Sequence, residues 1–154
     1  MALKIVIKSP FERLAAAAAS LGQVHKATDA DGKPLAVKLQ YPDMQSAVEA
    51  DLRQLRLIFS IYARYDKAIH TDEIYKELSA RLREELDYQR EARHMALYGL
   101  MLKDEPGVHV PQSVDTLTTP RVLTMNWLDG ARLLDFIAAH DDQESRNRVA
   151  LNMF

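Results

Sequence analysis

The change of hydrophobic period along the chain is the feature that most limits its fold. Residues 23–27 and 35–40 favour extended structure, and the turn signal Asp31-Gly32, followed by Pro34, lies between them. We therefore expect an antiparallel hairpin. From residue 43 onward, apolar residues recur at spacings of three and four, which indicates amphipathic helices. Strand-like runs return after residue 107, so the pattern predicts an α+β fold in which an antiparallel sheet packs on two long helices.

Two long helices are predicted between residues 43 and 101. The first extends from Asp43 to Lys67, and its apolar stripe consists of Met44, Val48, Leu52, Leu55, Phe59 and Tyr62. The second begins at Thr71 or Asp72, either of which can cap it. Its stripe continues loosely to Met101 and begins with Ile74, Leu78, Leu82 and Leu86.

The last third of the chain is predicted to contain a second hairpin and two further helices. The runs HVPQSVDTL and RVLTMNWL are strand-like and are separated by Thr118-Thr119-Pro120. The segments ARLLDFIAAH and ESRNRVALNMF are helical in pattern, and the chain stops inside the second without a capping glycine. We expect such an end in a fragment of a longer protein.

Composition and charge exclude several classes of function. A chain of 154 residues with 47% hydrophobic and 27% charged residues is typical of a single globular domain. The net charge of −2, with both signs interspersed, argues against nucleic acid as a partner. The absence of cysteine excludes disulfides, thiolate metal sites and a cysteine nucleophile. The sequence contains neither a bilayer-spanning apolar run nor the pattern of a secretory signal.

Lys38 is the first candidate functional residue. The period of two places Ala36, Lys38 and Gln40 on one face of the strand. Two interpretations remain open on this evidence. The lysine lies exposed on an edge strand, as most lysines do, or it lies beneath a phosphate-covering loop and is held there by a helix glutamate, as in protein kinases.

The acidic segment REELDYQREARH supplies the candidate partners for that lysine. A rotation of about 100° per residue places Glu84, Asp87 and Glu91 on one side of a continuous helix. Glu85 then lies beside the apolar stripe, and we expect it to be the most covered carboxylate. For the other acids, a solvated helix face with charges of alternating sign is the ordinary interpretation.

The alanine run at residues 15–19 is ambiguous when taken alone. Glycine-rich phosphate loops let backbone N–H groups approach the phosphates, whereas alanine carries a methyl group and favours helix. In this stretch only Gly22 supplies unusual backbone freedom. Composition alone therefore predicts the start of a helix.

Five motifs taken together resemble a known family. AAAASLGQVHKA, LAVKLQYPDM, ELDYQREA, VPQSVDTLTTP and RVLTMNWLDG follow one another in the order found in UbiB-type atypical kinases, which are linked to ubiquinone biosynthesis. The resemblance runs from about Ala15 to the C-terminus. An alanine-rich loop in place of the glycine-rich loop is a hallmark of that family.

The resemblance implies a protein-kinase-like N-lobe at residues 15–130, followed by the first C-lobe helices at 131–154. Residues 1–14 remain unassigned. ATP or ADP is the implied ligand, with Mg²⁺ held by residues downstream of this chain. Lys38 would contact the nucleotide, Glu85 would be its partner, and Glu91 would be a second acid of the motif. The implied nucleotide-covering loop is Ala16, Ala17, Ala18, Ala19 and Ser20, and the implied adenine-lining segment, residues 125–129, includes Met125, Asn126, Trp127 and Leu128.

Several family motifs are missing from this sequence. It has no KxGQ tetrad, no catalytic-loop aspartate with its asparagine, and no metal-binding aspartate before Phe-Gly. Because phosphoryl transfer depends on these groups, we expect the chain alone to lack catalysis. The implied partners are adenine nucleotide and either quinone-biosynthesis proteins or a membrane surface, with a cytoplasmic location at the membrane periphery. The alternative function is a non-catalytic helical interaction domain, since fold does not fix function.

Overall fold

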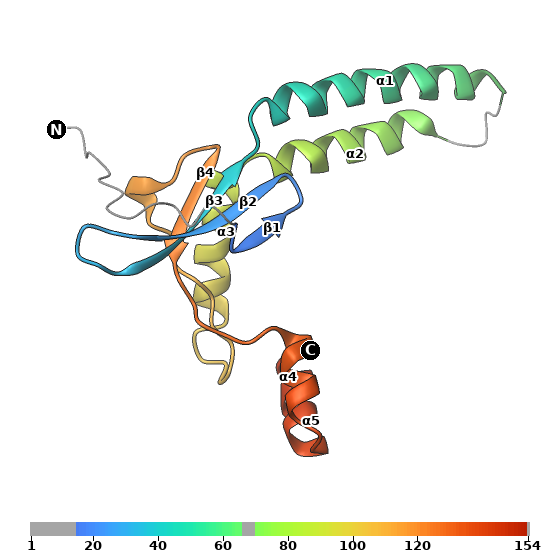
Figure 1. The fold of residues 1–154 in the computed structure, drawn as a ribbon. Helices are drawn as coiled ribbons and strands as arrows, with labels where there is room; N and C mark the ends of the chain where they lie inside the picture. Colours follow the sequence, from blue (N-terminus) through green and yellow to red (C-terminus); the bar gives the residue numbers. More distant parts are fainter. Residues whose placement is uncertain (1–14, 66–69, 154) are drawn as a thin grey trace.

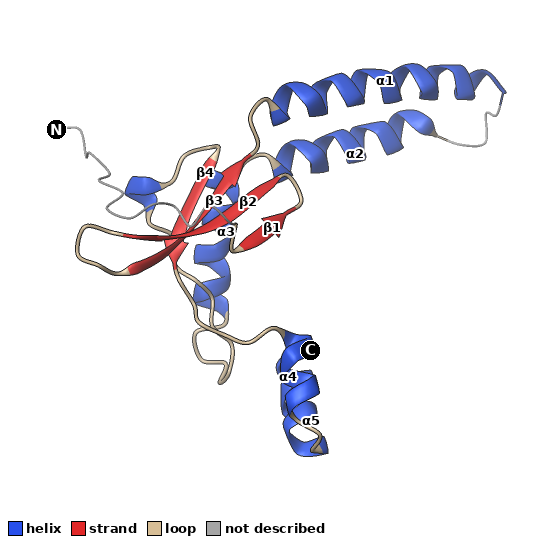
Figure 2. Ribbon diagram, viewed as in Figure 1, coloured by secondary structure: helices blue, strands red, loops and turns tan. Residues whose placement is uncertain are grey.

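The computed structural model describes residues 15–65 and 70–153 and shows one antiparallel sheet with helices around it (Figures 1 and 2). The predicted segment 1–14 and the end of the first predicted helix lie outside the described residues. The sheet has the order β1-β2-β3-β4. Its strands are β1 (Ala17–Ala19), β2 (Gly22–Thr28), β3 (Pro34–Gln40) and β4 (Val122–Asn126). The α+β class is confirmed.

The predicted first hairpin is formed by β2 and β3. At its turn, the Asp29 side chain accepts hydrogen bonds from the backbone N–H groups of Asp31 at 2.9 Å and Lys33 at 2.8 Å. Gly32 has a φ of 84°, a left-handed conformation that glycine adopts without steric cost. The turn signal in the sequence therefore predicted this connection correctly.

Lys38 lies on a central strand. β3 pairs with β2 on one side and with β4 on the other, and Lys38 is opposite Val24 and Leu123. The interpretation of Lys38 as an exposed residue on an edge strand is therefore wrong.

The helices α1 (Met44–Tyr65) and α2 (Thr71–Glu85) form an antiparallel arm that projects from the sheet (Figure 1). Val48 and Leu52 of the predicted stripe are buried. Arg83 of α2 donates two hydrogen bonds to the carboxylate of Glu49 on α1, at 2.8 and 3.1 Å. The residue before α2 is His70, which makes no side-chain capping bond, so the predicted cap at Thr71 or Asp72 is wrong.

The second predicted helix is divided in two. α2 ends at Glu85 and α3 (Tyr88–Met101) begins after a break. At the break, the Leu86 and Asp87 N–H groups bond to carbonyls three residues earlier, at Arg83 and Glu84. The Asp87 side chain then caps α3 by accepting from the Arg90 N–H at 3.0 Å. The expectation of one helix to Met101 is wrong because an N-cap residue lies inside the apolar pattern.

The second predicted hairpin is also absent. The run at residues 109–117 contains the isolated bridge from Ser113 to Met125 and the short 3-10 helix η1 (Asp115–Leu117), but no strand. β4 pairs instead with β3, which lies far away in sequence. Pro111 provides no N–H for a ladder, and only short pairings of Gln112 and Val114 with β4 remain.

The two C-terminal helices are confirmed as α4 (Leu133–Ala139) and α5 (Gln143–Met153). Arg146 of α5 donates to the carbonyls of His140 at 2.9 Å and Ile137 at 3.2 Å, which joins α5 to the end of α4. Within residues 15–65 and 70–153, no helix has the length and apolar character required to cross a bilayer.

The core lies where α3 meets the sheet. Tyr88 and Ala92 of α3 pack with Leu123 of β4, and Met95 and Met125 extend this cluster. Tyr88 and Leu123 are fully buried. This contact fixes α3 against the central strands and thereby positions the residue that faces Lys38.

Candidate functional site

The ammonium group of Lys38 forms an ion pair with Glu91 of α3. Its Nζ donates to both carboxylate oxygens, at 2.8 and 2.7 Å. The exposed fractions of the two side chains are 19% and 39%. The ion pair thus joins a lysine on a central strand to a glutamate on the packed helix, and both side chains are partly shielded from solvent.

Glu85 is not the partner of Lys38, and this prediction is corrected. Glu85 is the last residue of α2 and is exposed. The prediction assumed a helix that continues through residue 91, whereas the break after Glu85 gives α3 its own direction. The second acid of the motif, Glu91, takes the place that was expected for Glu85.

Tyr88 lies beside this ion pair, although the sequence did not single it out. Lys38, Glu91 and Tyr88 are called here the Lys38 cluster. The ammonium of Lys38 lies 4.7 Å from the centre of the Tyr88 ring, a cation–π arrangement. The hydroxyl is buried and has no hydrogen-bond partner. Burial raises the pKa of Tyr88 to about 12, and the nearby carboxylates of Glu91 and Glu85 add to the effect. The signal in the sequence was its position, three residues before Glu91 on the same helix.

The alanine run forms the edge of the same sheet. Ala17 and Ala19 of β1 pair with Val24 and Gly22 of β2, and the turn at residues 20–21 joins the strands. The helix start that composition favours is therefore wrong, because pairing with β2 overrides the propensity of alanine. Ala16 N–H also donates to the Val24 carbonyl at 2.8 Å, so the run is a strand followed by a turn.

Gly22 allows the hairpin of β1 and β2, called here the alanine hairpin, to lie close to α3. A Cβ at this position would collide with the Leu39 carbonyl and lie 3.0 Å from the Tyr88 hydroxyl. The absence of a side chain at residue 22 therefore permits the contact between the alanine hairpin and Tyr88.

The segment predicted to line the adenine, residues 125–129, begins within the last two residues of β4. Asn126 exchanges backbone and side-chain hydrogen bonds with Gln112. The Trp127 N–H donates to the Pro34 carbonyl at 3.2 Å, and its indole donates to Asp129 at 2.7 Å. Lys26, which the sequence analysis missed, lies 4.5 Å from the centre of the Trp127 ring. Met125 and Asn126 are thus part of β4, Trp127 is bonded to β3, and Leu128 is 45% exposed.

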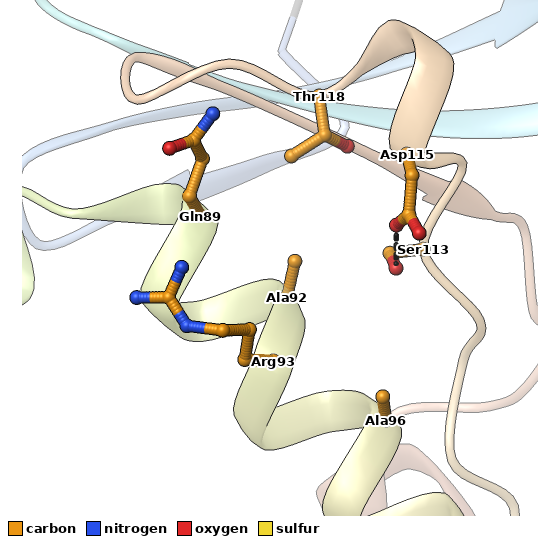
Figure 3. Close-up of a pocket in the computed structure, with 7 residues that line it drawn as sticks. All are labelled: Gln89, Ala92, Arg93, Ala96, Ser113, Asp115 and Thr118. Atoms are coloured by element: carbon orange, nitrogen blue, oxygen red, sulfur yellow. Dashed lines mark hydrogen bonds between the residues drawn. The ribbon is translucent and has the colours of Figure 1, made fainter.

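A groove lies between α3 and residues 113–118 (Figure 3). It has a volume of about 360 Å³ and is lined by Gln89, Ala92, Arg93, Ala96, Ser113, Asp115 and Thr118. Helical rotation of about 100° per residue places Glu91 nearly opposite the α3 residues of this groove. None of the predicted site residues lines it, and it is separate from the Lys38 cluster.

The part of the chain that the structure describes contains no group of three or more His, Cys, Asp or Glu residues that could hold a metal ion. The neighbours of the Lys38 ammonium are the carboxylate of Glu91 and the ring of Tyr88.

Comparison with known proteins decides the family. Residues 7–154 match the ABC1 atypical kinase-like domain. The chain belongs to this family. It is 32% identical over 145 residues to the mitochondrial atypical kinase COQ8 of Saccharomyces cerevisiae, covering 94% of this chain and 28% of that protein. It is 38% identical over 129 residues to the chloroplastic protein ACTIVITY OF BC1 COMPLEX KINASE 1 of Arabidopsis thaliana, covering 81% and 19%. The ABC1-family chain thus spans less than a third of these relatives, and the resemblance to UbiB-type atypical kinases is confirmed.

A solved structure supports the fold of this ABC1-family chain. The complex of Rv3197 with erythromycin from Mycobacterium tuberculosis has a TM-score of 0.75 and 32% sequence identity, covering 88% of this chain and 34% of that one. The likeness confirms the kinase-like fold class.

Proposed function

We propose that this chain is the nucleotide-binding N-lobe of an ABC1-family atypical kinase or ATPase and binds ATP or ADP together with Mg²⁺. The observation that carries the proposal is the ion pair between Lys38 on a central strand and Glu91 on α3. Protein kinases use a strand lysine held by a helix glutamate to contact nucleotide phosphates.

Lys38 binds the phosphate in this proposal, and Glu91 orients it. An ammonium has three N–H donors, two of which face the carboxylate oxygens of Glu91. The third remains for a phosphate oxygen, with which it forms a charge-assisted bond. Mg²⁺, when bound with the nucleotide, would neutralise phosphate charge.

The alanine hairpin covers the phosphates in this arrangement. Ala16–Ser20 would lie over them, and the methyl groups would restrict how closely backbone N–H groups approach. Residues 125–128 would line the adenine, with Trp127 held by Pro34 and Lys26.

The domain boundaries and cellular context belong to the same proposal. Residues 15–130 form the N-lobe, and residues 131–154 begin the C-lobe that closes the cleft. The whole protein would act in ubiquinone or lipid metabolism, with quinone-biosynthesis proteins or a membrane surface as partners and a cytoplasmic site at the membrane periphery. The family match and the name of the COQ8 relative support the metabolic part of this context, whereas the relatives are mitochondrial or chloroplastic and give the cytoplasmic site no support.

Calorimetric titration of the full-length protein with Mg²⁺ and ATP or ADP tests the proposal. Lys38→Ala removes a charge-assisted contact worth about 1.5 to 3 kcal/mol, so affinity should fall roughly ten- to a hundredfold. Lys33→Ala is the matched control, because Lys33 lies exposed in the β2–β3 turn and should leave affinity unchanged.

A non-catalytic interaction domain is the second candidate. The observation that favours it is the arm of α1 and α2, where Leu57, Ile58 and Ile61 are more than half exposed, at 63%, 59% and 52%. If neither nucleotide binds at millimolar concentration, or if Lys38→Ala binds as well as the wild type, this second function becomes the better one.

A further inference from the structure

The hydroxyl of Tyr88 is a buried donor that lacks an acceptor. Tyr88 is 1% exposed, and its oxygen has no hydrogen-bond partner. Leaving a buried hydroxyl unpaired is costly, and native structures rarely do so without a reason. Phenylalanine would fill the same space without this cost, so packing alone does not account for the hydroxyl.

The surroundings of the hydroxyl point toward the proposed phosphate site. The Tyr88 ring lies beneath the ammonium of Lys38, at 4.7 Å from ring centre to Nζ. Tyr88 is also the first residue of α3, the end of a helix at which the macrodipole favours negative charge. A protonated phenol and an ammonium are therefore two donors near the start of α3, where the carboxylates of Asp87 and Glu91 also lie.

Gly22 of the alanine hairpin is one of the residues that cover the hydroxyl. It is the first residue of β2 and follows the turn of the hairpin. Gly22 has no side chain, and β1 is an edge strand of three residues. The backbone bonds near this turn include Ala16 N–H to Val24 at 2.8 Å and Tyr41 N–H to Leu21 at a longer 3.3 Å. Gly22 is also paired with Gln40 of β3, so uncovering the hydroxyl requires the start of β2 to separate from β3.

We propose that the Tyr88 hydroxyl donates a hydrogen bond to a phosphate oxygen of the bound nucleotide. The hydroxyl reaches this oxygen when the alanine hairpin, including Gly22, moves away from Tyr88. This inference rests on the proposed nucleotide site. It assigns the orphan donor an acceptor in the bound state, next to the one that Lys38 contacts.

The test uses Tyr88→Phe in the full-length protein, with Mg²⁺-ADP and adenosine as probes. We expect the affinity for ADP to fall about tenfold, since a hydrogen bond to a charged group is lost. The affinity for adenosine, which has no phosphate, should stay the same. The stability of the nucleotide-free protein should be unchanged or higher, because an unsatisfied buried hydroxyl is removed. Tyr98→Phe is the matched control, because Tyr98 lies on the same helix and is 55% exposed.

The outcomes separate this inference from the function on which it rests. If the wild type binds ADP and Tyr88→Phe binds it equally well, the inference is overturned while the nucleotide site stands. If Tyr88→Phe loses affinity for adenosine as much as for ADP, the hydroxyl acts on the fold of the site and the inference is again overturned. If the wild type binds no ADP, the proposed function fails and this inference fails with it.

Discussion

Lys38 Nζ lies 2.8 and 2.7 Å from the two carboxylate oxygens of Glu91, a residue 53 positions away in sequence. This ion pair joins the central strand β3 to α3. Because α3 is also fixed to β4 through Tyr88, Ala92 and Leu123, the carboxylate is presented to the lysine by a packed helix. The pair is therefore set by the core and not by a flexible surface contact.

Neutralising Glu91 should weaken nucleotide binding, whereas neutralising Glu85 should not. Glu91→Gln removes the charge that holds the ammonium of Lys38, and we expect affinity for Mg²⁺-ADP to fall about three- to tenfold. Glu85→Gln changes an exposed carboxylate at the end of α2 and should leave affinity unchanged. Calorimetry on both full-length variants checks this, and equal losses in the two would contradict the assigned pairing.

The sequence predicted the strand face of Lys38 but not its partner. Alternation with period two is robust within one strand, so the residues around Lys38 were placed correctly. The glutamate was chosen by helical rotation across residues 71–101, and such reasoning fails wherever the helix is interrupted. Asp87 was read as one of the acids on a helix face, whereas it caps α3.

The strand at Ala17–Ala19 shows a different limit. Alanine has the highest helix propensity, so composition indicated a helix. Its pairing with β2 depends on Gly22 and on the approach of α3, which are tertiary features. The family resemblance drew attention to this run as part of the site, although periodicity did not. Its role over the phosphates stays a prediction.

Two glycines should respond in opposite directions to alanine substitution. In Gly22→Ala, the new methyl group would meet the Leu39 carbonyl and the Tyr88 hydroxyl, and we expect a loss of about 2–3 kcal/mol in the free energy of unfolding. In Gly99→Ala, nothing lies within 4 Å of the added Cβ in α3, and a gain of about 0.5–1 kcal/mol is expected from helix propensity. Denaturant unfolding of both variants measures the difference. A neutral Gly22→Ala would show that the alanine hairpin does not approach the Leu39 carbonyl of β3 and the Tyr88 hydroxyl of α3 as described.

The exposed apolar face of α1 should cause the isolated chain to self-associate. Ile58 and Ile61 are 59% and 52% exposed and lie one turn apart, and apolar patches of this kind favour association. The double variant Ile58→Lys/Ile61→Lys should shift the chain toward monomer without lowering its thermal transition. Sedimentation velocity over a range of concentrations measures this. A wild-type chain that stays monomeric throughout, with a cooperative transition, would contradict the prediction.

The raised pKa of Tyr88 should make stability fall at alkaline pH. Burial raises this pKa from 10.0 to about 12 in the folded chain, while an unfolded tyrosine ionises near 10. The folded state therefore keeps its proton to higher pH. The stabilising contribution is fully present below pH 10 and is lost as pH rises toward about 12. Between these values the free energy of unfolding should decrease more steeply for the wild type than for Tyr88→Phe.

The same group can be followed directly by its ionisation in the folded protein. Spectrophotometric titration of tyrosinate should show a late step near pH 12 that is absent from Tyr88→Phe and retained in Tyr98→Phe. The comparison isolates the phenol, because both variants keep every lysine and every other tyrosine. If the titration curves of the wild type and Tyr88→Phe differ only by one ordinary tyrosine, the Tyr88 hydroxyl is solvated. The absence of a late step would then contradict the burial of this hydroxyl.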